Sequence, residues 1–197
     1  MGIGIHTGTS FVGYIGSNEQ MKYDAIGSNV NLSSRIESYS TGGQILISEE
    51  CKKASTLRLN IDANYSVLPK GASTEIKLYS VGGIGSPYNI DCKFRIDLPS
   101  TLPEPIEIEF STIENKHCGT EIYSGRITAM SKTYATLETL CPLMLFDNIR
   151  ITSKGTVSCK VVSKSVNGFL LRFTSIPKIV EEWKSNTKLL TGDADGK

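Results

Sequence analysis

The sequence predicts an α+β protein in two parts, with a mixed strand-and-helix segment over residues 1–82 and a small antiparallel β-barrel over residues 104–190. Three observations support this. Strand and helix patterns alternate in the first segment. A stretch rich in Gly, Pro and Ser follows over residues 83–103, as expected of a linker. Beyond it, short β-type runs recur at regular spacing. The 197-residue length fits one large domain or two small ones.

Short β-type runs open the first segment. "GIGIH" and "FVGYIG" are separated by the turn "TGTS", and "MKYDAIG" follows them. A helix is predicted next, in "NVNLSSRIES", with Ser28 or Asn29 as its cap. Then come a strand in "GGQILIS", a short helix in "EECKKAS" capped by Ser48, and a closing pair of strands in "NYSVLPKG" and "EIKLYSVGG". This predicted succession of strands and helices is that of an α+β segment.

The second part is dominated by β-type runs. They are "PIEIEFSTI", "TEIYSGRITAM", "YATLETL", "LFDNIRITS", "TVSCKVVSK" and "GFLLRFT". Several strands of this length suit a small barrel or a sandwich. A terminal helix is predicted in "IPKIVEEWKSNTKLL", where Ile179, Val180 and Trp183 form one apolar stripe. Residues 191–197 are expected to be a disordered tail.

Charge and hydropathy exclude two function classes. The net charge is +1, with 21 basic and 20 acidic residues, so the basic excess expected of a nucleic-acid binder is missing. No apolar run approaches the ~18–20 residues that span a bilayer. The opening "MGIGIHTG" lacks the features of a signal peptide. We therefore expect a cytoplasmic protein with no membrane segment in this chain and no nucleic-acid partner.

The cysteines indicate a reducing compartment. There are five, an odd number, scattered without a C-x-x-C pair. His117 and Cys118 are the only close pair of soft metal ligands, and no second pair completes a tetrahedral site. The sequence therefore predicts no metal site in this chain.

The first predicted helix carries Asn31 and Arg35 one turn apart, so their amide and guanidinium share a face. None of the helical neighbours of Arg35 is acidic, which leaves it without a local ion-pair partner. Two interpretations stay open. Arg35 binds an anionic ligand, or it pairs with a carboxylate from elsewhere in the fold. Asn31 likewise suits a plain surface amide, and Asp24 a turn residue at a strand end.

Residues 2–38, "GIGIHTGTSFVGYIGSNEQMKYDAIGSNVNLSSRIES", resemble the second half of the class III nucleotidyl cyclase catalytic domain. The family pattern is G-I-H-x-G, then G-x-x-G, then Y-[DT]-x-x-G-x-x-V-N-x-[AS]-[SA]-R. "GGQILISEE" and the later "LPKG" and "IKLYSV" continue it to about residue 82. The resemblance implies a partial ferredoxin-like α/β sandwich for residues 1–82.

The resemblance also implies residue roles. Asp24 falls on the base-selecting position, where a carboxylate accepts the amino hydrogen of adenine and favours ATP over GTP. Asn31 falls on the residue that orients the ribose, and Arg35 on the arginine that stabilises charge on the α-phosphate. Lys70, in "PKG", falls near the lysine that contacts the terminal phosphates, although by itself it suits a solvated side chain. His6 is expected to be a strand residue without a catalytic role.

Two Mg²⁺ or Mn²⁺ ions are implied for the complete enzyme. The family's metal-binding aspartates, and the lysine that pairs with the base-selecting residue, belong to the first half of its domain, ahead of the matching region. Residues 88–197 contain no displaced copy of the aspartates. We therefore expect no metal binding and no turnover by this chain alone. Because the family builds its sites at a dimer interface, the expected partners are ATP and a second copy or a complementing cyclase half.

Residues 104–186 weakly resemble PilZ-like β-barrels. Members that bind cyclic di-GMP carry an R-x-x-x-R arm and a [DN]-x-S-x-x-G turn. Here "AMSKTY" keeps Ser131, but Ala129 and Tyr134 replace the acidic or amide residue and the glycine, and Arg95 has no partner four residues away. We expect a regulatory or assembly module that does not bind cyclic di-GMP.

The leading hypothesis is part of an adenylate cyclase-type enzyme that converts ATP to cyclic AMP and pyrophosphate. In this hypothesis the chain supplies the base, ribose and transition-state contacts. The alternative is a non-catalytic nucleotide-binding or regulatory scaffold that keeps the nucleotide-facing helix. Nucleic-acid binding through the barrel is disfavoured by the near-neutral charge.

Overall fold

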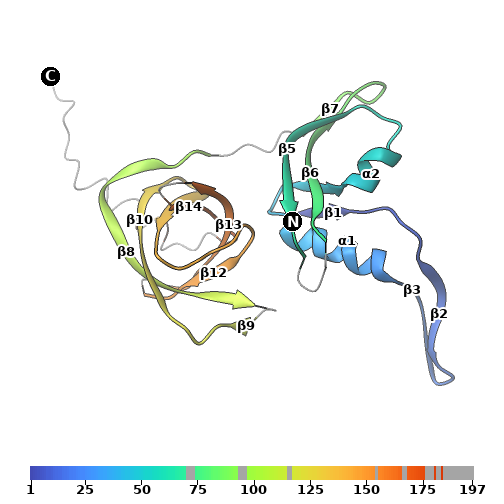
Figure 1. The fold of residues 1–197 in the computed structure, drawn as a ribbon, viewed down its shortest axis with the longest axis horizontal. Helices are drawn as coiled ribbons and strands as arrows, with labels where there is room; N and C mark the ends of the chain where they lie inside the picture. The colour runs from blue at the N-terminus through green and yellow to red at the C-terminus, as the bar shows by residue number, and fades with distance from the viewer. Residues whose placement is uncertain are drawn as a thin grey trace. The chain divides into compact units, whose positions relative to one another are not determined.

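The computed structural model describes most of the chain in two units. The described residues are 1–69, 74–92, 97–114, 117–153, 155–165 and 168–175, with Val180 and Trp183. One unit comprises Met1–Arg95 and the other Ile96–Lys197 (Figure 1). The first contains strands and helices and the second is built mainly of strands, which confirms the predicted mixed α and β content.

A sheet forms the centre of the first unit. Its strands lie in the order β1 (Ile3–Ile5), β4 (Ile45–Ser48), β6 (Ile76–Ile84) and β5 (Leu59–Val67), and β7 (Ile90–Asp91) pairs with the end of β6. The pairing of β1 with β4 is parallel, and the other pairings are antiparallel. Two helices accompany the sheet, α1 (Ser28–Tyr39) and α2 (Glu49–Ala54).

Helix α1 packs closely on the sheet. Ile36 is fully buried on its inner face, and Leu46 on β4 and Leu78 on β6 are fully buried as well. A Cβ placed on Gly4 of β1 would lie 2.2 Å from the backbone nitrogen of Glu37, far inside van der Waals contact. Only glycine at this position allows the strand and the helix backbones to approach so closely. The close packing fixes which face of α1 is left for solvent.

Strands β2 (Phe11–Ser17) and β3 (Gln20–Ile26) form a separate two-stranded hairpin between β1 and α1. Their antiparallel ladder runs from the pair Phe11 and Ile26 to the turn. The hairpin projects from the sheet in Figure 1. Its large apolar side chains are exposed. A two-stranded hairpin with no further packing is only marginally stable in water.

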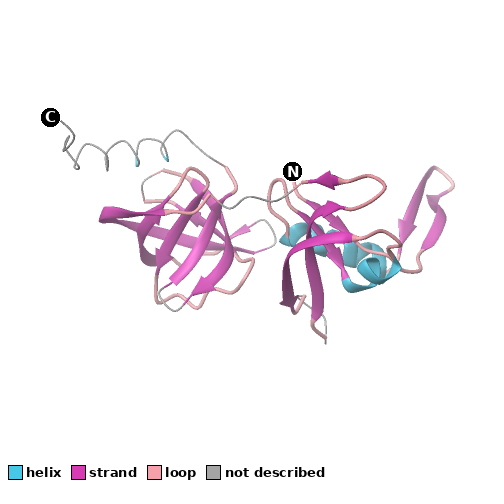
Figure 2. Ribbon diagram, turned by 90° about the horizontal axis from the view of Figure 1, so that it is seen from above, coloured by secondary structure: helices cyan, strands magenta, loops and turns pink. Residues whose placement is uncertain are grey.

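The second unit is a closed β-barrel, seen as a ring in Figure 1 and from the side in Figure 2. This result confirms the predicted barrel. Strand β8 (Ser100–Glu114) pairs with both β10 (Tyr123–Met130) and β12 (Asn148–Ile151), which closes the ring. The other members are β11 (Tyr134–Glu138), β13 (Val157–Ser165) and β14 (Gly168–Phe173), while β9 (His117–Cys118) pairs with the end of β8. The predicted linker over residues 83–103 overlaps strands at both ends, because β6 ends at Ile84 and β8 begins at Ser100.

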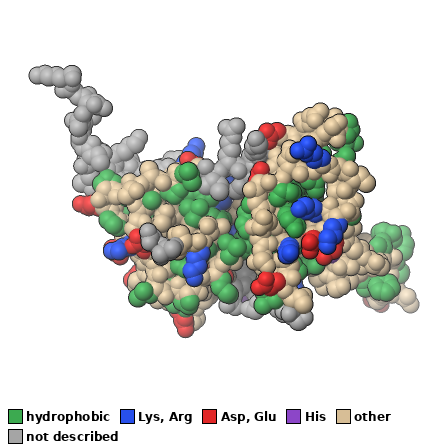
Figure 3. All heavy atoms as spheres, turned by 45° about the horizontal axis from the view of Figure 1, so that its top comes forward, with side chains coloured by type: hydrophobic (Ala, Val, Ile, Leu, Met, Phe, Trp, Pro, Cys, Tyr) green, Lys and Arg blue, Asp and Glu red, His purple; other side chains and the backbone are tan. Residues whose placement is uncertain are grey.

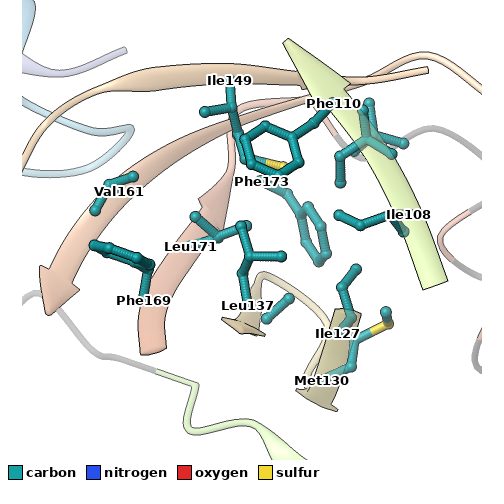
Figure 4. Close-up of a cluster of buried hydrophobic side chains, with 14 of the residues drawn as sticks. Ile108, Phe110, Ile127, Met130, Leu137, Ile149, Val161, Phe169, Leu171 and Phe173 are labelled. Carbon is teal, nitrogen blue, oxygen red and sulfur yellow. The ribbon is translucent and has the colours of Figure 1, made fainter. Parts of the chain in front are cut away.

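The barrel interior is a hydrophobic core (Figure 4). Along β14, Phe169, Leu171 and Phe173 are buried and alternate with partly exposed residues, the period-two pattern of a strand with one face inside. They meet Phe110 from β8 in the same cluster. Burial raises the pKa of the Cys159 thiol, which lies in this core, so Cys159 is expected to stay protonated and unreactive.

Beyond Ser175 the chain is described at two positions, Val180 and Trp183. Both are helical and both join the barrel core, consistent with the apolar stripe that the sequence predicts. All other residues of the predicted terminal helix and tail lie outside the described residues, so that helix, like the ferredoxin-like sandwich, stays a prediction. Among the described residues, no helix has the length and apolar character needed to cross a membrane.

Candidate functional site

Helix α1 presents a polar face to solvent. It begins at Ser28, where Gly27 caps it with φ 146°, a backbone conformation that favours glycine, and the backbone nitrogen of Asn31 donates to Gly27 O at 3.2 Å. The predicted side-chain cap by Ser28 or Asn29 was wrong. No side chain caps this helix, and the Asn29 amide is engaged by residues before the hairpin. The Ser48 cap of α2 is confirmed, since its side chain accepts from Cys51 N.

Asn31 and Arg35 are both exposed on α1, whereas Ile36 is buried. Among the described residues, no carboxylate forms a salt bridge with Arg35 and no hydrogen bond to its guanidinium is found. Its charge acts on the neighbouring Tyr39: burial raises the pKa of that phenol, and Arg35 partly offsets the rise. The guanidinium is therefore accessible to an anion from outside the described part of the chain.

Asp24 lies on β3 of the hairpin and already has an in-chain partner. Lys22 Nζ donates to its Oδ2 at 2.7 Å, and the backbone nitrogen of Ala25 donates to its Oδ1 at 2.9 Å. Residues i and i+2 of a strand share a face, which brings the two side chains together. The lysine hydrogen bond, then that from Ala25, lowers the pKa of Asp24. A carboxylate has about four acceptor positions, so Asp24 can still accept from a base.

Replacing Lys22 by glutamine is expected to raise the pKa of Asp24, because its largest stabilising hydrogen bond and nearest positive charge are lost. In the wild type the lowered pKa favours the folded state above the pKa of the unfolded chain. This advantage disappears as the pH falls through the folded-state pKa. The carboxyl carbon of Asp24, followed by NMR against pH, measures the change. Lys52→Gln, which removes a lysine over the Tyr79 ring, is the control and should leave the Asp24 midpoint unchanged.

Lys70 and Arg95 lie outside the described residues. The described part of the chain contains no group of three or more His, Cys, Asp or Glu side chains placed to hold a metal ion. The two metal ions that the cyclase resemblance implies therefore have no donor set among these residues. Asp24, which the resemblance places at the base, bonds to Lys22 and is not part of a carboxylate cluster.

A polar cluster that the sequence did not reveal lies beside α1. The His6 side chain is only 4% exposed and contacts Asn29 at the start of α1 and Ser48 at the end of β4. The sequence predicted a strand residue without a catalytic role. Its partners lie 23 and 42 residues away, so local patterns could not find them.

In the barrel, Ser131 stabilises the turn between β10 and β11. Its Oγ accepts from Tyr134 N at 3.0 Å, and Asp97 Oδ2 accepts from Lys132 N at 2.9 Å. The Tyr134 ring is buried, and the guanidinium of Arg172 lies 5.6 Å from its centre. The serine shared with PilZ-like turns thus acts as a turn residue here.

The surface view in Figure 3 shows basic and acidic side chains interspersed, and hydrophobic ones gathered over the hairpin. On one face of the hairpin lie Val12, Tyr14, Met21 and Tyr23, with Tyr14 72% exposed. The rings of Tyr14 and Tyr23 pack edge to face, 5.2 Å apart. We call these four residues the hairpin apolar face.

Comparison with known proteins finds similarity in the first part of the chain. Residues 1–97 match the adenylate and guanylate cyclase catalytic domain. We refer to residues 1–97 as the cyclase segment. It contains α1, the hairpin and the sheet, and so all the described residues that the resemblance assigned to the nucleotide.

Individual cyclases are similar over the same part of the chain. Adenylate cyclase 1 of Rhizobium meliloti (strain 1021) is 37% identical over 87 residues, which are 41% of this chain and 12% of that protein. The solved guanylyl cyclase Cya2 is 44% identical, with a TM-score of 0.44, over 46% of each chain. The adenylyl cyclase CyaB from P. aeruginosa is 35% identical, with a TM-score of 0.37, over 44% of this chain and 43% of its own. The similarity thus spans less than half of each relative.

Proposed function

We propose that the cyclase segment supplies the base, ribose and phosphate contacts of a nucleotidyl cyclase site that converts ATP to cyclic AMP and pyrophosphate. The observation that carries this proposal is the exposed face of α1. There, a guanidinium without a carboxylate partner among the described residues lies one turn from Asn31, in a segment that matches the cyclase catalytic domain.

In the proposed reaction, the ribose 3′-hydroxyl loses its proton to solvent and its oxygen attacks the α-phosphorus. The bond from that phosphorus to the bridging oxygen breaks, and pyrophosphate leaves. Negative charge grows on the α-phosphate oxygens, and the planar donor fork of Arg35 stabilises it. Asn31 orients the ribose, and Asp24 accepts from the amino group of adenine. Because phosphoryl transfer depends on positioning and charge stabilisation, these contacts are a substantial part of a site.

The metal ions of such a site would activate the attacking oxygen and stabilise the leaving one. The described residues offer no cluster that holds them, so we assign no metal step to these residues. In this proposal the metal-binding carboxylates come from a complementing cyclase half or from a second subunit.

The hairpin apolar face is the proposed contact with that partner. A two-stranded ribbon with such exposed aromatic and aliphatic residues gains stability when another surface covers it. Tyrosines at the centre of an interface also contribute more binding energy than most other residues.

Replacing Tyr14 by lysine is expected to weaken association of the chain with itself or with a complementing half by about 2 kcal/mol or more, roughly thirtyfold in affinity. Sedimentation at several protein concentrations measures this change. Met144→Lys is the matched control, since Met144 is 70% exposed and lies in the barrel unit. Equal association of the Tyr14 variant and the wild type would contradict the proposed interface.

The activity test mixes the purified chain with a cyclase half that retains metal-binding carboxylates, in the presence of ATP and Mn²⁺. Cyclic AMP is expected from the mixture and from neither component alone. Product from this chain alone would contradict the assignment of the metal ions to a partner. A parallel assay with GTP tests the base preference attributed to Asp24.

A non-catalytic scaffold is the second candidate function, and the Lys22–Asp24 pair favours it. A lysine that occupies the proposed base contact is consistent with a segment that binds a nucleotide weakly or not at all. In that case the barrel would be the functional module, as a PilZ-like interaction domain. Failure of ATP to bind in the mixture described above, together with retained association, would support this candidate.

A further inference from the structure

The base of the β2–β3 hairpin contains a hydrogen-bonded chain that no proposed catalytic step uses. His6 Nε2 lies 3.1 Å from Asn29 Oδ1, and His6 Nδ1 lies 2.8 Å from Ser48 Oγ. Asn29 Nδ2 donates to the backbone oxygen of Thr9 at 2.8 Å. The chain joins the end of β1, the first turn of α1 and the end of β4 through a nearly buried imidazole.

The backbone oxygen of Thr9 fixes the direction of both hydrogen bonds that the Asn29 amide makes. A backbone oxygen only accepts, so Thr9 O requires the Asn29 amide nitrogen to face it, and Oδ1 then faces His6. Because Oδ1 also only accepts, Nε2 of the imidazole carries a proton. Ser48 Oγ lies 2.8 Å from Nδ1 and accepts from Cys51 N at 3.2 Å, and its hydroxyl also interacts with the Glu50 carboxylate. The nearest charged group is Glu50, with Oε2 3.8 Å from Nδ1.

The position of Asn29 gives this chain a mechanical role. The hairpin joins the sheet through residues 6–10 on one side and through Gly27 on the other. Asn29, two residues after Gly27, bonds Thr9, two residues before the first ladder residue Phe11. The loop backbone lies directly against the amide, since a Cβ on Gly8 would be 2.4 Å from Asn29 Cγ. One side chain thus connects both ends of the hairpin.

We propose that His6 and Asn29 are positioning residues that clamp the base of the hairpin, and so fix the orientation of Asp24 on β3 relative to Asn31 and Arg35 on α1. The consequence for nucleotide contacts rests on the proposed function, whereas the clamp itself does not. Loss of either hydrogen bond of Asn29 would free the hairpin to pivot at Gly27 while the sheet and the helix keep their fold.

The test compares two histidine replacements by NMR residual dipolar couplings of the whole chain. Glutamine places an amide nitrogen near the position of Nε2 and can still donate to Asn29, whereas asparagine reaches only the position of Nδ1. In the wild type and in His6→Gln, couplings of residues 11–26 and of α1 should fit one alignment. In His6→Asn, the hairpin couplings should decrease while those of α1 are retained. Unchanged hairpin couplings in a folded His6→Asn chain would overturn the clamp.

Asn29→Asp is the second variant and decides the question if His6→Asn does not fold. Its carboxylate still accepts from His6 but cannot donate to Thr9, and a negative charge near a helix start is tolerated. The hairpin couplings should decrease here too, and equal couplings to the wild type would overturn the proposal. The chain has two histidines, so in His117→Gln the remaining imidazole nitrogen signals belong to His6. A proton on Nδ1 alone at mildly alkaline pH would also refute the clamp.

ATP binding, measured on the same samples, separates this inference from the proposed function. A rigid hairpin in the wild type that loosens in both variants, with no ATP bound by any of them or by the mixture with a cyclase half, would support the clamp and contradict the proposed function. ATP bound equally by wild type and by variants with a loosened hairpin would overturn the positioning role.

Discussion

Replacing Arg35 by alanine is expected to reduce cyclic AMP formation, in the mixture of this chain with a metal-bearing cyclase half, by about a thousandfold or more. The guanidinium is exposed on α1 and makes no ion pair with a carboxylate among the described residues, so its loss should not disturb the fold. The loss should fall mainly on kcat, since the interaction is strongest when charge develops on the α-phosphate.

Two further variants make the Arg35 experiment specific. Arg35→Lys keeps the charge but replaces a planar fork by a point charge, so only part of the activity should remain. Arg126→Ala is the matched control, because this exposed barrel arginine pairs with Glu138 at 2.8 Å and lies outside the cyclase segment. Full activity in Arg35→Ala would show that α1 does not contact the reacting phosphate.

Phe110→Ala is expected to destabilise the barrel by about 3–5 kcal/mol, because the ring is fully buried in the core and its removal leaves a cavity. Fluorescence of Trp183, the only tryptophan of the chain, reports on this core during unfolding in urea. The transition midpoint should move to lower urea concentration.

Phe11→Ala is the matched control for the barrel experiment. The Phe11 ring is 80% exposed on the hairpin, so its removal should change the free energy of unfolding of the barrel by no more than about 0.5 kcal/mol. An equal shift of the Trp183 transition in both variants would contradict the assignment of Phe110 and Trp183 to one core.

Sequence reasoning found the features that depend on residues close together in the chain. The shared face of Asn31 and Arg35 follows from helical spacing, and the cap of α2 from Ser48 ahead of two glutamates. The barrel followed from the number and spacing of its strands. The Lys22–Asp24 pair could have been found in the same way, because residues two apart on a strand lie on one face.

The features that it missed depend on distant contacts. Asn29 suits a helix cap by residue type, but its amide binds Thr9 and His6, so tertiary contacts override the local preference. The strand patterns of β2 and β3 were clear. Their separation from the main sheet was not, because periodicity does not say which strands pair.

Strand pairing also limits how each unit can recruit other chains. The barrel strands form a continuous ring through β8, so few of their backbone groups are free to pair with a bound peptide. A partner of the barrel would therefore have to recognise side chains. In the sheet of the first unit, β1 has a strand neighbour on one side only among the described residues, and Ile3 and Ile5 beside that margin are partly exposed. Extension of a sheet by an incoming strand is therefore available at β1 of the first unit, whereas the strands that close the barrel offer no free edge.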